Sequence, residues 1–220
     1  MTSTRNDVTR PNPIDFSLYL ISDRQTLPKG RDLLTTVEEA LQGGVDAVQL
    51  RDKDLPETER LELAHQLRAL TRRYRARLLI NGSVDIALAA EADGVHLGAS
   101  SLPVTEARRL LGPKRLIGYS AHSLDELAPV TRQGADFATF SPVFYTPSKA
   151  TYSPPQGLQR LAAACSTDPL PIFALGGIDL KRIATVRQAG AKGIAVISAI
   201  LSSSEPRLAA QDLRAALTEN

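Results

Sequence analysis

The sequence predicts a single (β/α)8 TIM barrel with a parallel eight-stranded core, and three observations support this prediction. Short apolar runs without charge recur along the chain, as in strands that are buried on both faces of a parallel sheet. Amphipathic segments lie between these runs, and one small-residue phrase recurs just before four of them. Strands that alternate with helices form a parallel sheet, and eight such strands can close on themselves. The 220 residues suit one barrel near the lower end of its usual size.

The expected strands follow one another at fairly regular intervals. They are Leu18–Ser22, Ala47–Leu50, Leu78–Ile80, Gly94–Leu97, Leu116–Ser120, Phe137–Phe140, Ile172–Leu175 and Gly193–Val196. Residues 59–70 form the clearest helical segment, with apolar residues at helical spacing. The recurring phrase reads Gly43-Gly-Val-Asp-Ala-Val, Glu91-Ala-Asp-Gly-Val, Gly134-Ala-Asp-Phe-Ala and Gly190-Ala-Lys-Gly-Ile-Ala. In each copy a small residue ends a helix, a polar residue turns the chain and a strand begins.

Composition and charge are those of an ordinary globular protein, and a net charge of +2 points to no particular partner. The densest basic run, residues 72–77, more simply ends a helix than binds nucleic acid, since cations complement the helix dipole there. Residues 1–13 are polar, and we expect a flexible tail there, ahead of a barrel domain over residues 14–220. Neither this tail nor any later run has the length and apolar character of a membrane span. The lone Cys165 fits a reducing compartment, so we expect a cytoplasmic protein without nucleic-acid or membrane partners.

Polar side chains gather where the expected strands end, which is the face that carries the active site in barrels of this type. Alternation along the second strand should project Gln49, Arg51 and Lys53 to one face. Together with Lys149, the two cations of this strand would suit a phosphorylated or carboxylated small molecule, although each could instead be a surface ion-pair partner. Lys149 lies in the loop 142–157, which is rich in proline and could close over the site as a lid.

Two neighbouring strand ends carry a pattern typical of phosphate binding. Gly176 and Gly177 end the seventh expected strand, and Ile197 and Ser198 follow the eighth. Glycines let backbone N–H groups approach an anion closely, and a helix N-terminus favours negative charge. The loops after strands 7 and 8 form the usual phosphate site of this fold. The alternative is that the two glycines only make a tight turn.

The remaining polar candidates each have a structural alternative. His122 follows the fifth strand, where a neutral imidazole can shuttle protons near pH 7, or it serves only the loop. His96 lies among apolar residues and is equally a ligand contact or a core hydrogen-bond partner. Asn81 precedes Gly82, so it either binds a ligand or makes a turn. The histidines lack metal-ligand spacing, and Gly82 and Ala99-Ser100-Ser101 stand at the ends of the third and fourth strands where Mg²⁺ would need carboxylates, so no metal cofactor is expected.

Eight motifs fall in the order found in the thiamine phosphate synthase superfamily, which this chain resembles from Leu18 onward. They are Leu18-Tyr-Leu-Ile-Ser-Asp23, Val48-Gln-Leu-Arg-Asp-Lys53, Leu79-Ile-Asn-Gly-Ser-Val-Asp-Ile-Ala-Leu88, Ala92-Asp-Gly-Val-His-Leu-Gly98, Ile117-Gly-Tyr-Ser-Ala-His-Ser-Leu124, Ser141-Pro-Val-Phe-Tyr-Thr-Pro-Ser-Lys149, Ala174-Leu-Gly-Gly-Ile178 and Gly193-Ile-Ala-Val-Ile-Ser-Ala-Ile200. The resemblance implies a TIM-barrel enzyme of thiamine biosynthesis.

Two activities occur in this superfamily. Its synthases join an aminopyrimidine pyrophosphate to a thiazole phosphate, while Mg²⁺ bound by two aspartates neutralises the departing pyrophosphate. The matching positions here are Gly82 and Ser101, which carry no charge. Its thiazole tautomerases resemble this chain in the Asn-Gly pair and in a stretch like Ser203-Ser204-Glu205-Pro206, and their acid–base histidine falls on His122.

The resemblance therefore leads us to expect a cofactor-free thiazole tautomerase, an isomerase that aromatises a carboxythiazole phosphate by proton transfer at His122. The first alternative is a thiamine phosphate synthase, a transferase that uses Mg²⁺. The second is a regulatory paralogue that binds thiazole phosphate or thiamine phosphate without catalysis, and a homodimer stays open in each case. The expected substrate-binding residues are Gln49, Arg51, Lys53, Asn81, His96, Ser120 and Lys149, and the expected phosphate-binding residues are Gly176, Gly177, Ile197 and Ser198.

Overall fold

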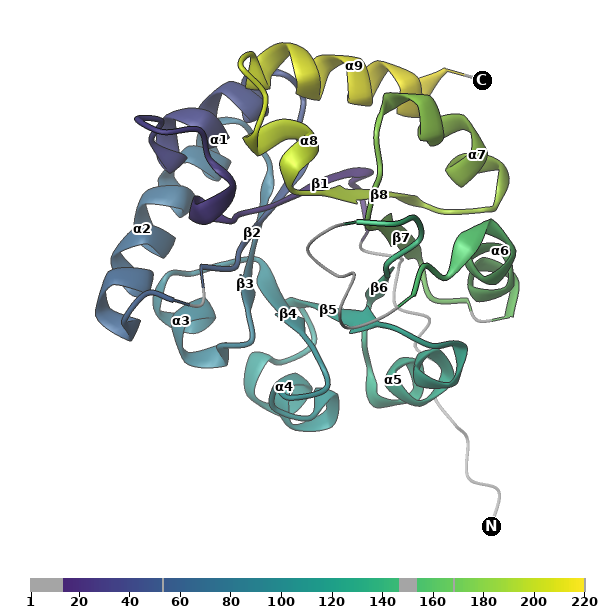
Figure 1. The fold of residues 1–220 in the computed structure, drawn as a ribbon. Coiled ribbons are helices and arrows are strands. Elements are labelled where there is room, and N and C mark those ends of the chain that lie inside the picture. The colour runs from purple at the N-terminus through teal and green to yellow at the C-terminus, as the bar shows by residue number, and fades with distance from the viewer. Residues whose placement is uncertain (1–13, 53, 147–153, 168, 220) are drawn as a thin grey trace.

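The protein is a closed barrel of eight parallel strands. The computed structural model describes residues 14–52, 54–146, 154–167 and 169–219. Within these residues each strand pairs with its sequence neighbours, and β8 pairs with β1 to close the ring. Figure 1 looks into this ring and shows the helices arranged around its outside. The predicted (β/α)8 architecture is confirmed.

The strands lie where the apolar runs predict them, within one residue at each end. They are β1 Leu18–Ile21, β2 Ala47–Leu50, β3 Arg77–Asn81, β4 Gly94–Leu97, β5 Leu116–Ala121, β6 Phe137–Phe140, β7 Ile172–Leu175 and β8 Gly193–Val196. All residues of five of them, β1, β2, β4, β6 and β8, are buried, because the barrel interior covers one face and the helices cover the other.

The helices follow the strands in alternation, as expected for repeated β–α units. They are η1 Arg24–Thr26, α1 Leu33–Gln42, α2 Glu57–Arg73, α3 Val84–Ala89, α4 Val104–Leu111, η2 Leu124–Glu126, α5 Leu127–Gln133, α6 Gly157–Thr167, η4 Leu180–Arg182, α7 Ile183–Gln188, α8 Ser198–Leu201 and α9 Pro206–Thr218. Local signals start several of them: the Asp32 side chain accepts from the Thr35 N–H at 2.9 Å and caps α1. No helix in the described part of the chain is long and apolar enough to cross a bilayer.

The basic run at residues 72–77 serves the fold. Arg72 and Arg73 form the last turn of α2 and pair with Glu91 and Glu38, while Arg77 opens β3 and pairs with Asp15. Three of the four arginines of this run thus have ion-pair partners within the protein. The expected tail at residues 1–13 lies outside the described residues.

The barrel interior is filled by its own aromatic cluster. Phe16, Tyr19, Phe137 and Phe173 pack with ring centroids 5.0–6.2 Å apart. Phe16 precedes β1, so this cluster reaches the amino ends of the strands and closes the barrel there. A second, larger apolar cluster lies between the strands and the helices. In the described part of the chain, this packing fills the amino end of the barrel and leaves the carboxyl ends of the strands as the side for a site.

The recurring phrase before the strands has a structural function that we call the Asp clamp. In each clamp one carboxylate accepts hydrogen bonds of 2.5–3.1 Å from a backbone N–H at the start of the preceding strand and from an arginine. The three sets are Asp46 with Leu18 and Arg214, Asp93 with Leu78 and Arg68, and Asp136 with Ile117 and Arg108. In the fourth copy Lys192 takes the place of the aspartate. The clamps fasten β1 to β2, β3 to β4 and β5 to β6.

Candidate active site

A cavity of about 320 Å³ opens at the carboxyl ends of β7 and β8. Its walls include Gly176 and Gly177 after β7, and Ile197 and Ser198 after β8. The structure thus brings together the four residues that the sequence predicts for phosphate binding. A larger hollow of about 1090 Å³ lies between α7 and α9 on the outside of the barrel, away from the carboxyl ends of the strands. We therefore take the cavity at the barrel mouth as the candidate site.

The two glycines of this cavity are needed for packing as well as for access. Both have positive φ, +98° at Gly176 and +64° at Gly177, a region that other residues rarely adopt. A Cβ on Gly176 would lie 2.7 Å from Pro142 Cα, and one on Gly177 would lie 2.6 Å from the Tyr145 carbonyl oxygen. The loop after β6 thus rests directly on this turn, which supports the tight-turn interpretation without removing the phosphate-binding one.

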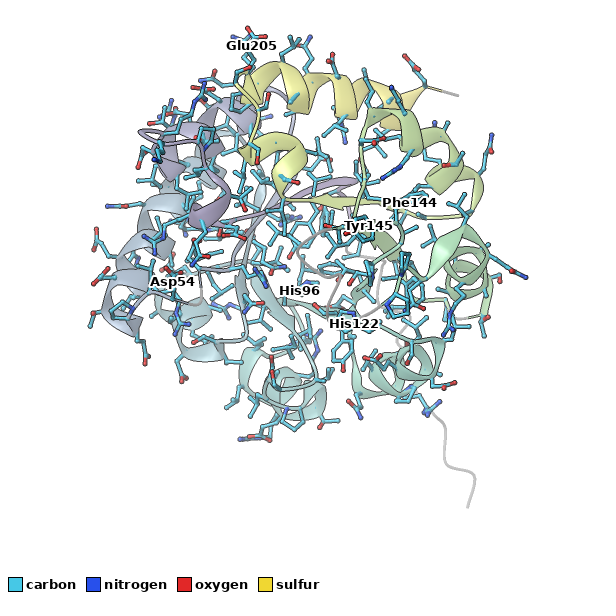
Figure 2. The ribbon with its side chains drawn as sticks, viewed as in Figure 1. Asp54, His96, His122, Phe144, Tyr145 and Glu205 are labelled. Atoms are coloured by element: carbon cyan, nitrogen blue, oxygen red, sulfur yellow. The ribbon has the colours of Figure 1, made fainter. Side chains whose placement is uncertain are left out.

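The carbonyl groups of the two glycines are occupied by donors from the protein. The Phe144 N–H donates to the Gly176 oxygen at 3.0 Å, and the Arg182 guanidinium donates to the Gly177 oxygen. The same guanidinium lies 4.6 Å from the centre of the Phe144 ring. Figure 2 shows Phe144 and Tyr145 together on the β6–β7 side of the ring. Since carbonyl oxygens repel anions, engaging both of them makes this turn a better anion site.

Arg51 follows β2 directly, and its backbone is fixed by a buried carboxylate. The Arg51 N–H donates to Ser22 Oγ at 2.8 Å, and Ser22 Oγ donates to Asp52 Oδ2 at 2.5 Å. Asp52 is 3 % exposed and also accepts from the Arg24 N–H at 2.8 Å. The Arg51 side chain is half-buried and forms no ion pair with the described residues. It is therefore a cation at the carboxyl end of β2 without a counter-charge among the residues that the structure describes.

Three of the predicted substrate-binding residues, Gln49, His96 and Ser120, belong to one hydrogen-bonded network. Gln49 Nε2 donates to Tyr19 Oη at 2.7 Å, and Tyr19 Oη lies 3.3 Å from His96 Nδ1. His96 Nε2 lies 3.1 Å from Ser120 Oγ and 3.4 Å from Thr139 Oγ1. His96 is only 1 % exposed and lies near the centre of the ring in Figure 2. Its burial favours the interpretation of His96 as a core hydrogen-bond partner over direct ligand contact.

Burial also sets the protonation of this network. Removal from water lowers the pKa of His96 to about 3, so the ring is neutral at physiological pH. The same cause raises the pKa of Tyr19 far above its ordinary value, so its hydroxyl keeps its proton. Gly118 makes room for the imidazole, because a Cβ there would overlap the His96 ring.

His122 stands at the mouth with one ring nitrogen engaged. Its Nδ1 lies 2.9 Å from the Ser141 carbonyl oxygen, which can only accept, so Nδ1 carries the proton. The lone pair of a neutral His122 is then on Nε2, where a base needs it. Glu126 Oε1 fixes the loop by accepting from the His122 N–H and from Ser123 Oγ, each at 3.0 Å. This geometry is compatible with proton transfer to a ligand in the mouth.

The positions that match the magnesium ligands of the synthases lie side by side without charge. Gly82 follows Asn81, which is half-buried at the end of β3, and a Cβ on Gly82 would lie 3.6 Å from Ser101 Oγ. Ser101 Oγ accepts from the Gly98 N–H at 3.0 Å. In the described part of the chain, no group of three or more His, Cys, Asp or Glu residues could hold a metal. These residues do not fit a carboxylate-bound Mg²⁺.

Two predicted site residues lie outside the described residues, and one supporting motif lies away from the mouth. Lys53, Lys149 and residues 147–153 of the proposed lid are not among the residues that the structure describes. Glu205, from the stretch that resembles the tautomerases, is exposed at the start of α9 and stands at the outer edge of the ring in Figure 2. That stretch leads into α9, which begins at Pro206, and within it the Glu205 N–H donates to Ser203 Oγ at 3.1 Å.

Sequence reasoning missed Tyr19 and Thr139 as members of the network. Both are 0 % exposed within apolar strands, where a hydroxyl must find a partner. The sequence feature that could have identified them is that each is the one residue with a polar group in an otherwise apolar strand. Sequence alone could not show whether Tyr19 faces the interior or the helices.

Comparisons with known proteins agree along the whole barrel. The family described as thiamine monophosphate synthase matches residues 18–200. A protein of Geobacter sulfurreducens, whose name of thiamine-phosphate synthase is provisional, is 55% identical over 93% of this chain and 95% of its own length. The thiamine-phosphate synthase of Syntrophomonas wolfei is 44% identical over 91% of this chain and 95% of its own length. The solved thiamine phosphate pyrophosphorylase of Pyrococcus furiosus superposes with a TM-score of 0.83 at 36% identity, covering 92% and 95% of the two chains.

Proposed function

The chain belongs to the thiamine monophosphate synthase family, and on that premise we propose that it is a thiamine-phosphate synthase. The reaction would join an aminopyrimidine pyrophosphate to a thiazole phosphate and release pyrophosphate. The observation that carries the proposal is the agreement with synthase-named relatives over nine-tenths of the chain. The comparisons lend no specific support to the tautomerase branch, which the sequence analysis places first.

The arrangement of the mouth supports a two-substrate reaction. Gly176, Gly177 and the start of α8 would hold the phosphate of the thiazole, since backbone N–H groups and a helix start favour an anion. Arg51 directly follows β2, and its guanidinium, which has no ion-pair partner among the described residues, would bind the pyrophosphate and stabilise its departure. Lys53 and Lys149 are proposed to add charge to the same group. Two separate anion sites are what a phosphate and a pyrophosphate require.

Magnesium does not fit the residues present, so no step is assigned to it. Gly82 and Ser101 offer no carboxylate where the synthases of the superfamily bind the ion. The proposal therefore assigns charge neutralisation to Arg51 and to the two lysines that the sequence predicts for the site, Lys53 and Lys149. Pyrophosphate departure should depend less on a divalent ion here than in an enzyme with both aspartates.

The direct test is to incubate the purified protein with both substrates and to measure pyrophosphate release and thiamine phosphate together, with and without a chelator. A double variant, Gly82→Asp with Ser101→Asp, restores the carboxylates, and Asp tolerates the positive φ of +71° at residue 82 better than most residues. Its matched control is Gly82→Asn with Ser101→Asn, which has the same shape without charge. We expect the chelator to reduce turnover of the Asp variant more steeply than that of the wild type or the Asn variant. Absence of coupled product in every condition would refute the proposal.

Thiazole tautomerase is the second candidate, favoured by His122. Its Nδ1 is held by the Ser141 carbonyl oxygen and its Nε2 is left as a base, while the missing carboxylates weaken the synthase. A positioned acid–base group contributes about 10²–10⁴-fold, which suits a reaction driven by aromatisation. Proton–deuterium exchange during turnover of the carboxythiazole phosphate tests it. If His122→Ala exchanges as fast as the wild type, His122 is not the base.

The two assays separate three outcomes. Coupled product without exchange supports the synthase, and exchange that depends on His122 without coupled product supports the tautomerase. Tight binding of thiazole phosphate or thiamine phosphate without either reaction supports a regulatory paralogue.

A further inference from the structure

Five polar side chains cross the barrel interior beneath the mouth as one chain of hydrogen bonds, which we call the relay. Its members are Gln49, Tyr19, His96, Ser120 and Thr139. Tyr19, Gln49, His96 and Thr139 are each at most 1 % exposed, whereas Ser120 is half-buried near the end of β5. A buried relay has to pair every donor with an acceptor, because an unpaired buried group costs stability.

The Tyr19 hydroxyl sets the direction of the relay. Gln49 Nε2, 2.7 Å away, can only donate, so it uses a lone pair of the hydroxyl oxygen. The hydroxyl proton then needs an acceptor, and His96 Nδ1 at 3.3 Å is the group in place to accept it. With the Gln49 amide in this orientation, Nδ1 is therefore unprotonated.

The tautomer of His96 follows from this step. The ring is neutral because burial lowers the pKa of His96 to about 3, so the single proton lies on Nε2. Nε2–H then donates to Ser120 Oγ at 3.1 Å or to Thr139 Oγ1 at 3.4 Å. With its oxygen accepting from His96, Ser120 has its own hydroxyl proton free to donate.

Only one other arrangement satisfies every member. If the Gln49 amide is turned over, its oxygen accepts from Tyr19, His96 carries its proton on Nδ1, and Ser120 donates to Nε2. The whole relay reverses as a unit, and so does what it presents at its two ends. The direction of the relay can consequently be determined by finding which ring nitrogen of His96 carries the proton.

We propose that Tyr19 and His96 are positioning residues that transmit this polarity from one end of the relay to the other, so that Gln49 presents an acceptor oxygen and Ser120 a donor hydroxyl to the substrate. The inference rests on the proposed synthase function for its substrate. An aminopyrimidine offers the complementary groups, because its exocyclic amine donates and its ring nitrogens accept. A substrate with its donor and acceptor exchanged would place an acceptor against the Gln49 oxygen and a donor against the Ser120 hydroxyl, and it would bind poorly.

The polarity can be read by NMR without any activity assay. The chain has 3 histidines, so protein labelled with ¹⁵N-histidine gives few ring signals, and His96→Gln assigns those of His96. A protonated and an unprotonated ring nitrogen have well-separated ¹⁵N shifts. We expect His96 with Nε2 protonated and Nδ1 bare, unchanged between pH 8 and pH 5. A proton on Nδ1 would overturn the proposal, whatever reaction the protein catalyses.

Tyr19→Phe tests the positioning role and removes only the hydroxyl. We expect mixed His96 tautomers and a KM for the aminopyrimidine pyrophosphate raised about tenfold, the value of one buried hydrogen bond. The KM for thiazole phosphate should change less than about twofold. The matched control is Tyr74→Phe, which removes a hydroxyl that bonds Glu38 on the outer helices and should move neither readout.

Each remaining outcome decides the matter. Unchanged tautomer and KM in Tyr19→Phe, or equal rises in both KM values, would contradict the positioning role. If Tyr19→Phe does not fold, the wild-type spectrum alone still tests the polarity. If the protein lacks synthase activity but shows the expected tautomer, the proposed function fails and the relay stands.

Discussion

At the amino ends of the strands, Asp46, Asp93 and Asp136 each hold a strand start and an arginine, whereas at the carboxyl ends Arg51 has no ion-pair partner among the described residues. The charges of the first set are satisfied within the protein, so they stabilise the fold and offer nothing to a ligand. The charge of the second is left open, so it contributes little to the fold and attracts an anion. The same side-chain chemistry thus serves stability at one end and binding at the other.

The relay lies between these two ends and shares a property with each. Like the Asp clamps, it is buried and hydrogen-bonded throughout. Like the mouth, it has a partly exposed end, because Ser120 is half-buried. If the comparison is right, changes at the amino end alter stability alone, changes at the mouth alter binding alone, and changes in the relay alter both.

Asp136→Ala should give the largest effect on stability. The Arg108 and Asp136 side chains are 12% and 8% exposed, so removing the carboxylate leaves a guanidinium largely buried without its partner. We expect the free energy of unfolding to fall by about 3 kcal/mol, with kcat/KM within about twofold at temperatures where the variant is folded. Urea denaturation and steady-state kinetics measure the two. Asp212→Ala, at an exposed position of α9, is the control. If Asp136→Ala instead loses activity while its stability is unchanged, the contrast between the two ends of the barrel is wrong.

Arg51→Met is the reciprocal change at the mouth. The methionine keeps much of the stem and removes the charge that would meet the pyrophosphate. We expect kcat/KM for the aminopyrimidine pyrophosphate to fall about 100-fold, a loss of about 2.7 kcal/mol, while the free energy of unfolding stays within about 0.5 kcal/mol. Arg132→Met on the exposed surface of α5 should change neither quantity. A large loss of stability in Arg51→Met would show that this cation serves the fold.

Acid should reveal the buried His96 through stability. Below its ordinary pKa of 6.5 the unfolded chain binds a proton there, whereas the folded chain does not until about pH 3. The unfolded state therefore binds more protons, and stability falls as the pH falls through this window. Between pH 7 and pH 5 the contribution is about 2 kcal/mol, at about 1.4 kcal/mol per pH unit below 6.5.

Urea midpoints at pH 7, 6 and 5 measure this effect, and two histidine variants assign it. His96→Gln should reduce the slope of stability against pH by the contribution of one bound proton, about 1.4 kcal/mol per pH unit. The variant should also be less stable than the wild type at every pH. His65→Gln, at an exposed position of α2, should leave the decline as it is. An equal decline in wild type and His96→Gln would mean that His96 titrates normally in the folded protein.

Lys192→Asp should give the smallest effect and the most specific one. The Lys192 backbone N–H donates to the Ile172 carbonyl oxygen at 2.8 Å, just as the backbone N–H of each clamp aspartate donates to the carbonyl oxygen of the equivalent strand residue. A carboxylate at 192 would accept from the Ile172 N–H and complete a fourth clamp. We expect about 0.5–1 kcal/mol of added stability without a change in kcat/KM. Lys192→Asn is the control for charge, and destabilisation by both variants would limit the clamp to the other three joints.

The fold could be predicted closely because each strand is a short apolar run with a recognisable joint before it. Ala47–Leu50 and Gly193–Val196, for example, lie as predicted. The function of the aspartate in those joints could not be predicted, because it binds the start of a different strand and so depends on the pairing. The same holds for Gly176 and Gly177, whose need for glycine comes from a loop that reaches them from β6.

Which of the predicted phosphate-binding residues lie together could be predicted from the sequence more directly than the activity they serve. Gly176, Gly177, Ile197 and Ser198 do meet in one cavity, as their places after β7 and β8 required. The tautomerase hypothesis drew on a stretch that starts α9 at the outer edge of the ring. A motif read along the chain carries no information about which end or face of the barrel it will occupy.

The Asp clamps fasten strands in pairs, and this has a consequence for how the chain could be rewired. A circular permutant opened between β2 and β3, in the turn before Glu57, would keep every clamped pair within one continuous segment. One opened between β3 and β4 would separate Leu78 from Asp93 along the chain, although both would still have to meet in space. The structural unit of this ring is thus a pair of neighbouring strands. β7 and β8 form the fourth pair, which has Lys192 in place of the clamp aspartate.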